Sequence, residues 1–138
     1  QFKETLRENE LLDHVNMYDH FVDEKEFDRG VKQSDFIWPM IHPNTESAIE
    51  YFRNQIPGAL NVALGYRIPL LVHEDFVKEW KDLSFAASYR LDTYRSDLEK
   101  ALANAEQLKL TLEQAEAYNP SFQEEKYLEF IFGKKVKK

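Results

Sequence analysis

The segment from Asn54 to Gly65 carries the strongest pattern for binding chemistry in this sequence. It reads NQIPGALNVALG, so that Gly58 opens a short apolar stretch, and a buried run follows. The first amides of a helix are unpaired and lie at the positive end of its dipole, and glycine lets a ligand approach the backbone. We therefore expect a phosphate site at the amides of Gly58, Ala59 and Leu60. The alternative is a plain turn before a buried helix.

His42 is the second candidate for binding. It follows the expected strand 35–41, in the sequence WPMIHP. Ligands of open α/β sheets bind beyond the carboxyl ends of the strands, and an imidazole there can contact a phosphate or a sugar hydroxyl. The alternative is a loop histidine that is hydrogen-bonded to nearby backbone.

Other catalytic patterns are absent from the sequence. The four histidines are scattered, and the run His73-Glu74-Asp75 is interpreted as an ordinary surface pairing. There is no His-x-x-x-His, Asp-x-Asp, Gly-x-Ser-x-Gly, Walker loop or Gly-x-Gly-x-x-Gly. The absence of cysteine excludes a disulfide scaffold, a thiolate metal site and a cysteine nucleophile. We expect neither a metal nor a cofactor.

Hydrophobic patterning predicts strands that alternate with helices. The expected strands are 15–22, 35–41, 68–73 and, as a weaker edge strand, 84–89. The expected helices are 2–12, 23–33, 45–53, 59–66, 76–83, 96–118 and one that begins near Ser121. Asp23 is the expected N-cap of helix 23–33, with Glu26 three residues on, and the last helix is expected to bury Tyr127, Phe130 and Ile131. Such alternation predicts an α/β fold with a parallel, doubly wound sheet that helices cover on both faces. The expected core comprises Ile37, Val62, Leu64, Leu70, Leu71, Leu98, Leu102 and Phe130.

Composition narrows the class of protein. The 138 residues fit one domain, and 43% are hydrophobic, enough for a core. A net charge of −7 disfavours binding to nucleic acid, which depends on Lys and Arg. No apolar run approaches the roughly 20 residues of a bilayer helix, and no signal peptide is visible, so we expect a cytoplasmic protein. The terminal KKVKK is interpreted as a solvated tail or as a contact for anionic lipid or a partner.

The order of these segments resembles the carboxyl-terminal domain of GT-B-type glycosyltransferases. That family places a strand ending near an Asp and a Pro before a Gly-led helix and a hydrophobic strand entered through Pro. Residues 26–39, EFDRGVKQSDFIWP, look like the first part, and residues 57–70, PGALNVALGYRIPL, look like the second. The resemblance implies a Rossmann-like domain, a nucleotide-diphosphate sugar as donor, and a diphosphate near Gly58 to Leu60.

The sequence also departs from the pattern of that family. Asn61, Val62 and Ala63 stand where many retaining members carry paired glutamates. The resemblance implies that the acceptor domain and at least one early strand–helix unit are missing, so that 1–138 is a single partial Rossmann-like domain. An incomplete sheet exposes an edge, for which we expect a homo-oligomer or a partner-dependent fold. A non-catalytic α/β protein-interaction module remains the alternative function.

Overall fold

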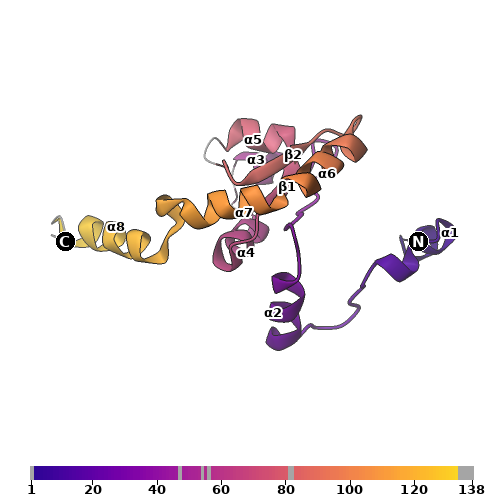
Figure 1. The fold of residues 1–138 in the computed structure, drawn as a ribbon, viewed down its shortest axis with the longest axis horizontal. Helices are drawn as coiled ribbons and strands as arrows, with labels where there is room; N and C mark the ends of the chain where they lie inside the picture. Colours follow the sequence, from indigo (N-terminus) through magenta and orange to yellow (C-terminus); the bar gives the residue numbers. More distant parts are fainter. Residues whose placement is uncertain (1, 47, 54, 56, 81–82, 134–138) are drawn as a thin grey trace. The chain divides into compact units, whose positions relative to one another are not determined.

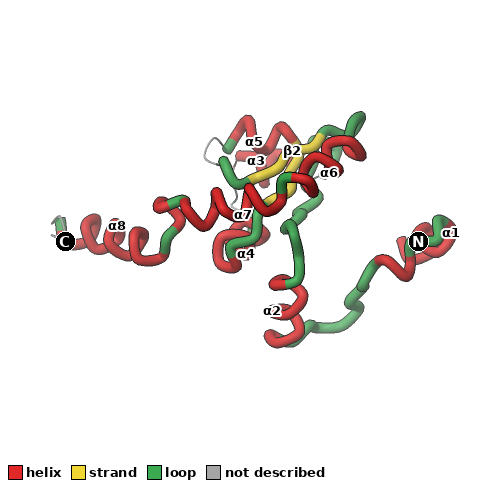
Figure 2. The backbone as a smooth tube through the Cα atoms, in the orientation of Figure 1, coloured by secondary structure: helices red, strands yellow, loops and turns green. Residues whose placement is uncertain are grey.

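The computed structural model describes residues 2–46, 48–53, 55, 57–80 and 83–133. The chain divides into two compact units, Gln1–Gly30 and Val31–Lys138. Figures 1 and 2 trace the helices, strands and loops of both units along the chain. The second unit contains all the strands of the described chain and every candidate binding residue.

The first unit consists of short helices joined by extended chain. Helix α1 is Phe2–Glu8, and the 3-10 turn η1 is Leu12–His14. Helix α2, Glu24–Lys32, begins in this unit and ends in the next. The start of α2 confirms the predicted cap, because the Asp23 carboxylate accepts a hydrogen bond from the Glu26 amide at 2.9 Å. The predicted strand 15–22 is wrong: these residues form no strand, and Phe21 is 92% exposed. Their alternating pattern has no neighbouring strand among the described residues to pair with.

A small parallel sheet lies at the centre of the second unit. Strand β1, Leu70–His73, pairs in parallel with β2, Ala86–Tyr89. The predicted strand 35–41 is reduced to one parallel bridge between Ile37 and Leu70, because Met40 has a left-handed backbone (φ 56°) that interrupts extended structure. The α/β class is confirmed, with two parallel strands and one bridging residue in the described part of the chain.

Helices cover both faces of β1, as its continuous apolar sequence predicts. Leu70 and Val72 share one cluster with residues from α4 (Gly58–Tyr66), α5 (Glu74–Glu79) and α7 (Ala105–Gln114). Leu71 lies in a second cluster with Tyr89 and with Ala101 of α6 (Tyr94–Ala103). The short helix α3 (Ala48–Arg53) contributes Phe52 to the first cluster.

The predicted core is only partly correct. Leu70 and Leu71 are fully buried, whereas Ile37, Val62, Leu64 and Leu98 are half-buried. Leu102 and Phe130 are wrong as core residues, with 52% and 87% of their surfaces exposed. For Leu102 the reason is that α6 turns Ala101 toward the sheet.

The carboxyl-terminal helices are shorter than the sequence predicts. The expected helix 96–118 is interrupted at Asn104 between α6 and α7, and the 3-10 turn η2, Glu116–Tyr118, follows. Helix α8, Pro120–Phe132, has no buried residue. The expectation that this helix buries Tyr127, Phe130 and Ile131 is therefore wrong.

Candidate functional site

The carboxyl ends of the parallel strands define the candidate site. In open α/β sheets, ligands bind in the crevice beyond these ends. His73 is the last residue of β1 and pairs in register with Tyr89, the last residue of β2. His42 follows the Ile37 segment, which runs parallel to β1. The first candidates for binding are therefore the residues at or just after the carboxyl ends of β1, β2 and the Ile37 segment.

Helix α4 comes before β1 in the chain and carries the predicted phosphate site at its start. It ends at Tyr66, where Arg67 adopts a left-handed cap (φ 58°), and β1 begins soon afterwards. Near its start, Leu60 belongs to the same cluster as Phe76, which comes after the carboxyl end of β1. Helix α4 therefore contributes to the buried core on one face of β1.

The helix begins at Gly58, where the sequence predicts it. The Leu60 amide donates to the Pro57 carbonyl at 2.9 Å, so it is already occupied. Among the described residues, no acceptor is found for the amides of Gly58 and Ala59. Gly58 is exposed, and a Cβ added to it would meet no atom within 4 Å. Packing therefore does not require glycine at position 58. The absence of a side chain would instead let a ligand approach the backbone closely.

His42 is held inside its own turn. Its Nδ1 accepts a hydrogen bond from the Asn44 amide at 3.2 Å, and its own amide donates to Thr45 Oγ1 at 3.3 Å. The His42 carbonyl accepts from the Thr45 amide at 2.8 Å. These bonds are those of a loop histidine bonded to nearby backbone, the alternative left open by the sequence. The ring is half-buried, and its Nε2 is available to bind another partner.

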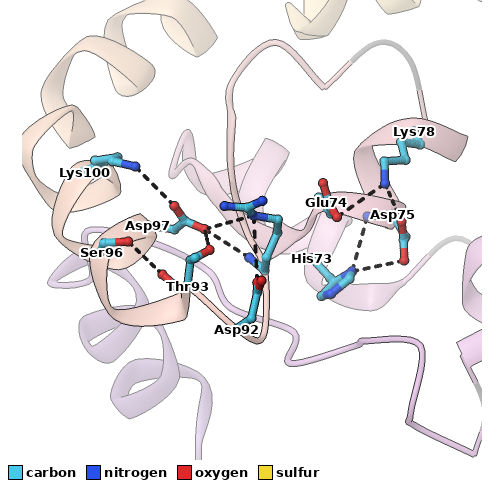
Figure 3. A network of polar contacts seen from close by, with 10 residues as sticks. His73, Glu74, Asp75, Lys78, Asp92, Thr93, Ser96, Asp97 and Lys100 are labelled. Carbon is cyan, nitrogen blue, oxygen red and sulfur yellow. Dashed lines mark hydrogen bonds and ion pairs between the residues drawn. The ribbon is translucent and has the colours of Figure 1, made fainter.

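His73 is a buried residue, so its interpretation as a surface pairing is wrong. It is 6% exposed, and its Nδ1 accepts from the Asp75 amide at 3.3 Å, which caps α5 (Figure 3). The same nitrogen lies 3.5 Å from Asp75 Oδ2. The ring meets Tyr89 edge-on, with centroids 5.6 Å apart, and Trp38 contacts Tyr89 in the same way. The β1–β2 end is therefore aromatic on one side and polar on the other.

The carboxylates near this edge already have partners. Lys78 donates to Asp75 at 2.8 Å, and this bond is the largest cause of the lowered pKa of Asp75; the nearby His73 adds to it. The same pair raises the pKa of Lys78. Both groups are therefore charged near neutral pH, and Asp75 is paired with a cation.

A second polar cluster fixes the loop after β2. Asp97 accepts from the Thr93 hydroxyl at 2.7 Å, from the Arg90 amide at 3.2 Å and from Lys100 at 3.4 Å. The Thr93 bond is the largest cause that lowers the pKa of Asp97. The Arg90 side chain is 51% exposed, and its Nε lies 3.9 Å from Asp97 and 4.0 Å from Asp92. This long separation leaves most of the guanidinium donors for other contacts.

Sequence reasoning missed His73 and Arg90. Both could have been found by the rule that selected His42, since His73 ends the predicted strand 68–73 and Arg90 follows the predicted strand 84–89. Two cavities are found in the second unit. One, of about 330 Å³, is lined by residues of β2, α6 and α7, among them Asp97, and one of about 180 Å³ adjoins Pro69 at the amino end of β1. Neither is lined by Gly58 or His42.

The described residues hold no group of three or more potential metal ligands. Within the same part of the chain, no helix combines the length and the apolar character needed to cross a bilayer. Comparison of the sequence with models of protein families and with curated proteins, and of the structure with solved structures, finds no match. The geometry of the strand ends and of the α4 start is therefore the basis for assigning a function.

Proposed function

We propose that the Val31–Lys138 unit binds the diphosphate of a nucleotide-sugar donor, as the donor-binding part of a glycosyltransferase. The observation that carries the proposal is the start of α4. Its first two amides are without an acceptor among the described residues, and the helix leads into a strand of the parallel sheet. A helix amino terminus with unpaired amides is a common place for a phosphate in α/β folds.

The charges near the edge support an anionic ligand. The half-exposed Arg90 follows β2, and the amides of Gly58 and Ala59 supply neutral donors at the start of α4. Asp75 and Asp97 are each paired with a lysine, which reduces their repulsion of a phosphate. The net charge of −7 is therefore compatible with an anion at this particular edge.

The test is a titration of the full chain with UDP and GDP, followed by amide NMR shifts. We expect saturable shifts at Gly58, Ala59, His42 and residues 73–75. Shifts confined to α8 and the first unit would contradict the proposed site. Saturating nucleotide without any shift would reject nucleotide binding.

The protein-interaction module is the second candidate, and one observation favours it. Tyr127, Phe130 and Phe132 of α8 are 63%, 87% and 66% exposed, an unusual density of aromatic surface for one helix. Absence of nucleotide shifts in that titration would favour this function over donor binding.

A further inference from the structure

We propose that His73 binds the ligand directly, by donating a hydrogen bond from Nε2 to a phosphate oxygen of the nucleoside diphosphate. This inference rests on the proposed function and adds a residue that the resemblance and the sequence patterns do not include. Its starting point is the combination of deep burial and incomplete hydrogen bonding in this one side chain.

The capping bond fixes which ring nitrogen carries the proton. Nδ1 accepts from the Asp75 amide, so in the neutral ring the proton is on Nε2. No acceptor for Nε2 is found among the described residues. No side-chain nitrogen or oxygen in that part of the chain is both fully buried and unpaired, so Nε2 must reach the surface through a small opening. A ligand oxygen can therefore meet it, although the rest of the ring is enclosed.

The surroundings keep the ring in a single orientation. Tyr89 meets it edge-on with ring centroids 5.6 Å apart, and Nδ1 accepts a hydrogen bond from the Asp75 amide. A donor that is already oriented loses little conformational freedom when a ligand binds. His73 also ends the central parallel segment, between β2 on one side and the Ile37 bridge on the other.

Two substitutions separate the two nitrogens. In His73→Asn the amide oxygen can still accept from the Asp75 amide and cap α5, but no donor reaches the position of Nε2. In His73→Gln a donor reaches farther, but the cap is lost. His20→Asn is the matched control, because this histidine is on the surface, with 64% of its side chain exposed.

The experiment measures UDP and GDP affinity of the full chain by calorimetry, together with thermal stability. We expect His73→Asn to keep the cap of α5 but to melt somewhat lower, because the buried ring is lost. Its Kd should rise by about 10-fold, from the loss of one hydrogen bond to a charged group. His73→Gln should melt lower and lose less affinity, and His20→Asn should change neither. Unchanged affinity in His73→Asn, with wild-type protein that binds, overturns this inference alone. Wild-type protein that binds neither nucleotide overturns the proposed function and this inference together.

A second measurement needs no ligand. Long-range ¹H–¹⁵N spectra of the imidazoles report which nitrogen carries the proton, and we expect the Nε2-protonated form for His73 near pH 8. A ring protonated only on Nδ1 would overturn the inference, because Nε2 would then be an acceptor and could not donate to phosphate.

Discussion

The burial of Leu70 gives the sharpest test of the fold that positions the site. Leu70 is 1% exposed, pairs with Ala86, and receives the bridge from Ile37, so it joins all three parallel segments. Leu70→Ala removes hydrocarbon worth about 2 kcal/mol at ~0.8 kcal/mol per carbon. The cavity that remains raises the expected loss of unfolding free energy to about 3–5 kcal/mol.

The assay is urea unfolding monitored by tryptophan fluorescence. Trp80 stacks on Phe76 with centroids 5.7 Å apart and packs against the cluster that contains Leu70, so its emission reports this core. Leu102→Ala is the matched control, since the same atoms are removed from a side chain that is 52% exposed. We expect a change of about 0.5 kcal/mol or less for the control, with similar m-values for both variants. Equal losses for the two variants would refute the proposed arrangement of the sheet.

The remaining predictions concern the site and the surface. Gly58→Val should abolish UDP binding without loss of stability. Gly65→Val should retain UDP binding, because its side chain also enters open space on α4 but lies away from the helix start. Equal UDP affinities of the two variants in calorimetry would contradict the phosphate site. Asp97→Asn should lower stability at neutral pH and weaken its acid dependence, because the lowered pKa of Asp97 contributes stability that is lost as the pH falls below about 4; identical acid unfolding curves would contradict this. Phe130→Glu should change the unfolding free energy by no more than about 0.5 kcal/mol in the same urea assay. The wild-type chain should self-associate at high micromolar concentration, since no described strand pairs with the outer edge of β2, and a monomer by light scattering would count against this.

Local signals in the sequence predict the local structure well. The Asp23 cap, the start of α4 at Gly58 and the buried run of β1 are all confirmed. Each depends on residues that are adjacent in sequence: a carboxylate three residues before an amide, a proline before a helix, or four consecutive apolar side chains. Such contacts form wherever the rest of the chain goes, which is why one sequence is enough to find them.

Features that need a distant partner are predicted poorly. Residues 15–22 alternate like a strand, but no second strand of the described chain pairs with them, and Phe21 is left exposed. Phe130 has helical spacing with other apolar residues, but α8 contacts mainly η2 and buries none of its own residues. An amphipathic pattern shows which side chains would be buried if a partner surface were present. It does not show that the partner is present.

The candidate site combines both kinds of information. The Gly58 helix start is local and is predicted correctly, whereas the burial of His73 depends on Tyr89, a residue on another strand. From the sequence, His73-Glu74-Asp75 is interpreted as a charged surface turn. In the structure β1 and β2 pair in register, and the His73 side chain is buried beside Tyr89 and caps α5. Its Nε2 has no acceptor among the described residues. The neighbouring carboxylate of Asp75 is paired with Lys78, so the donors that remain are nitrogen–hydrogen groups directed by the fold. The proposed contacts to an anion come from fixed N–H groups and one arginine, so the proposal is compatible with an acidic chain.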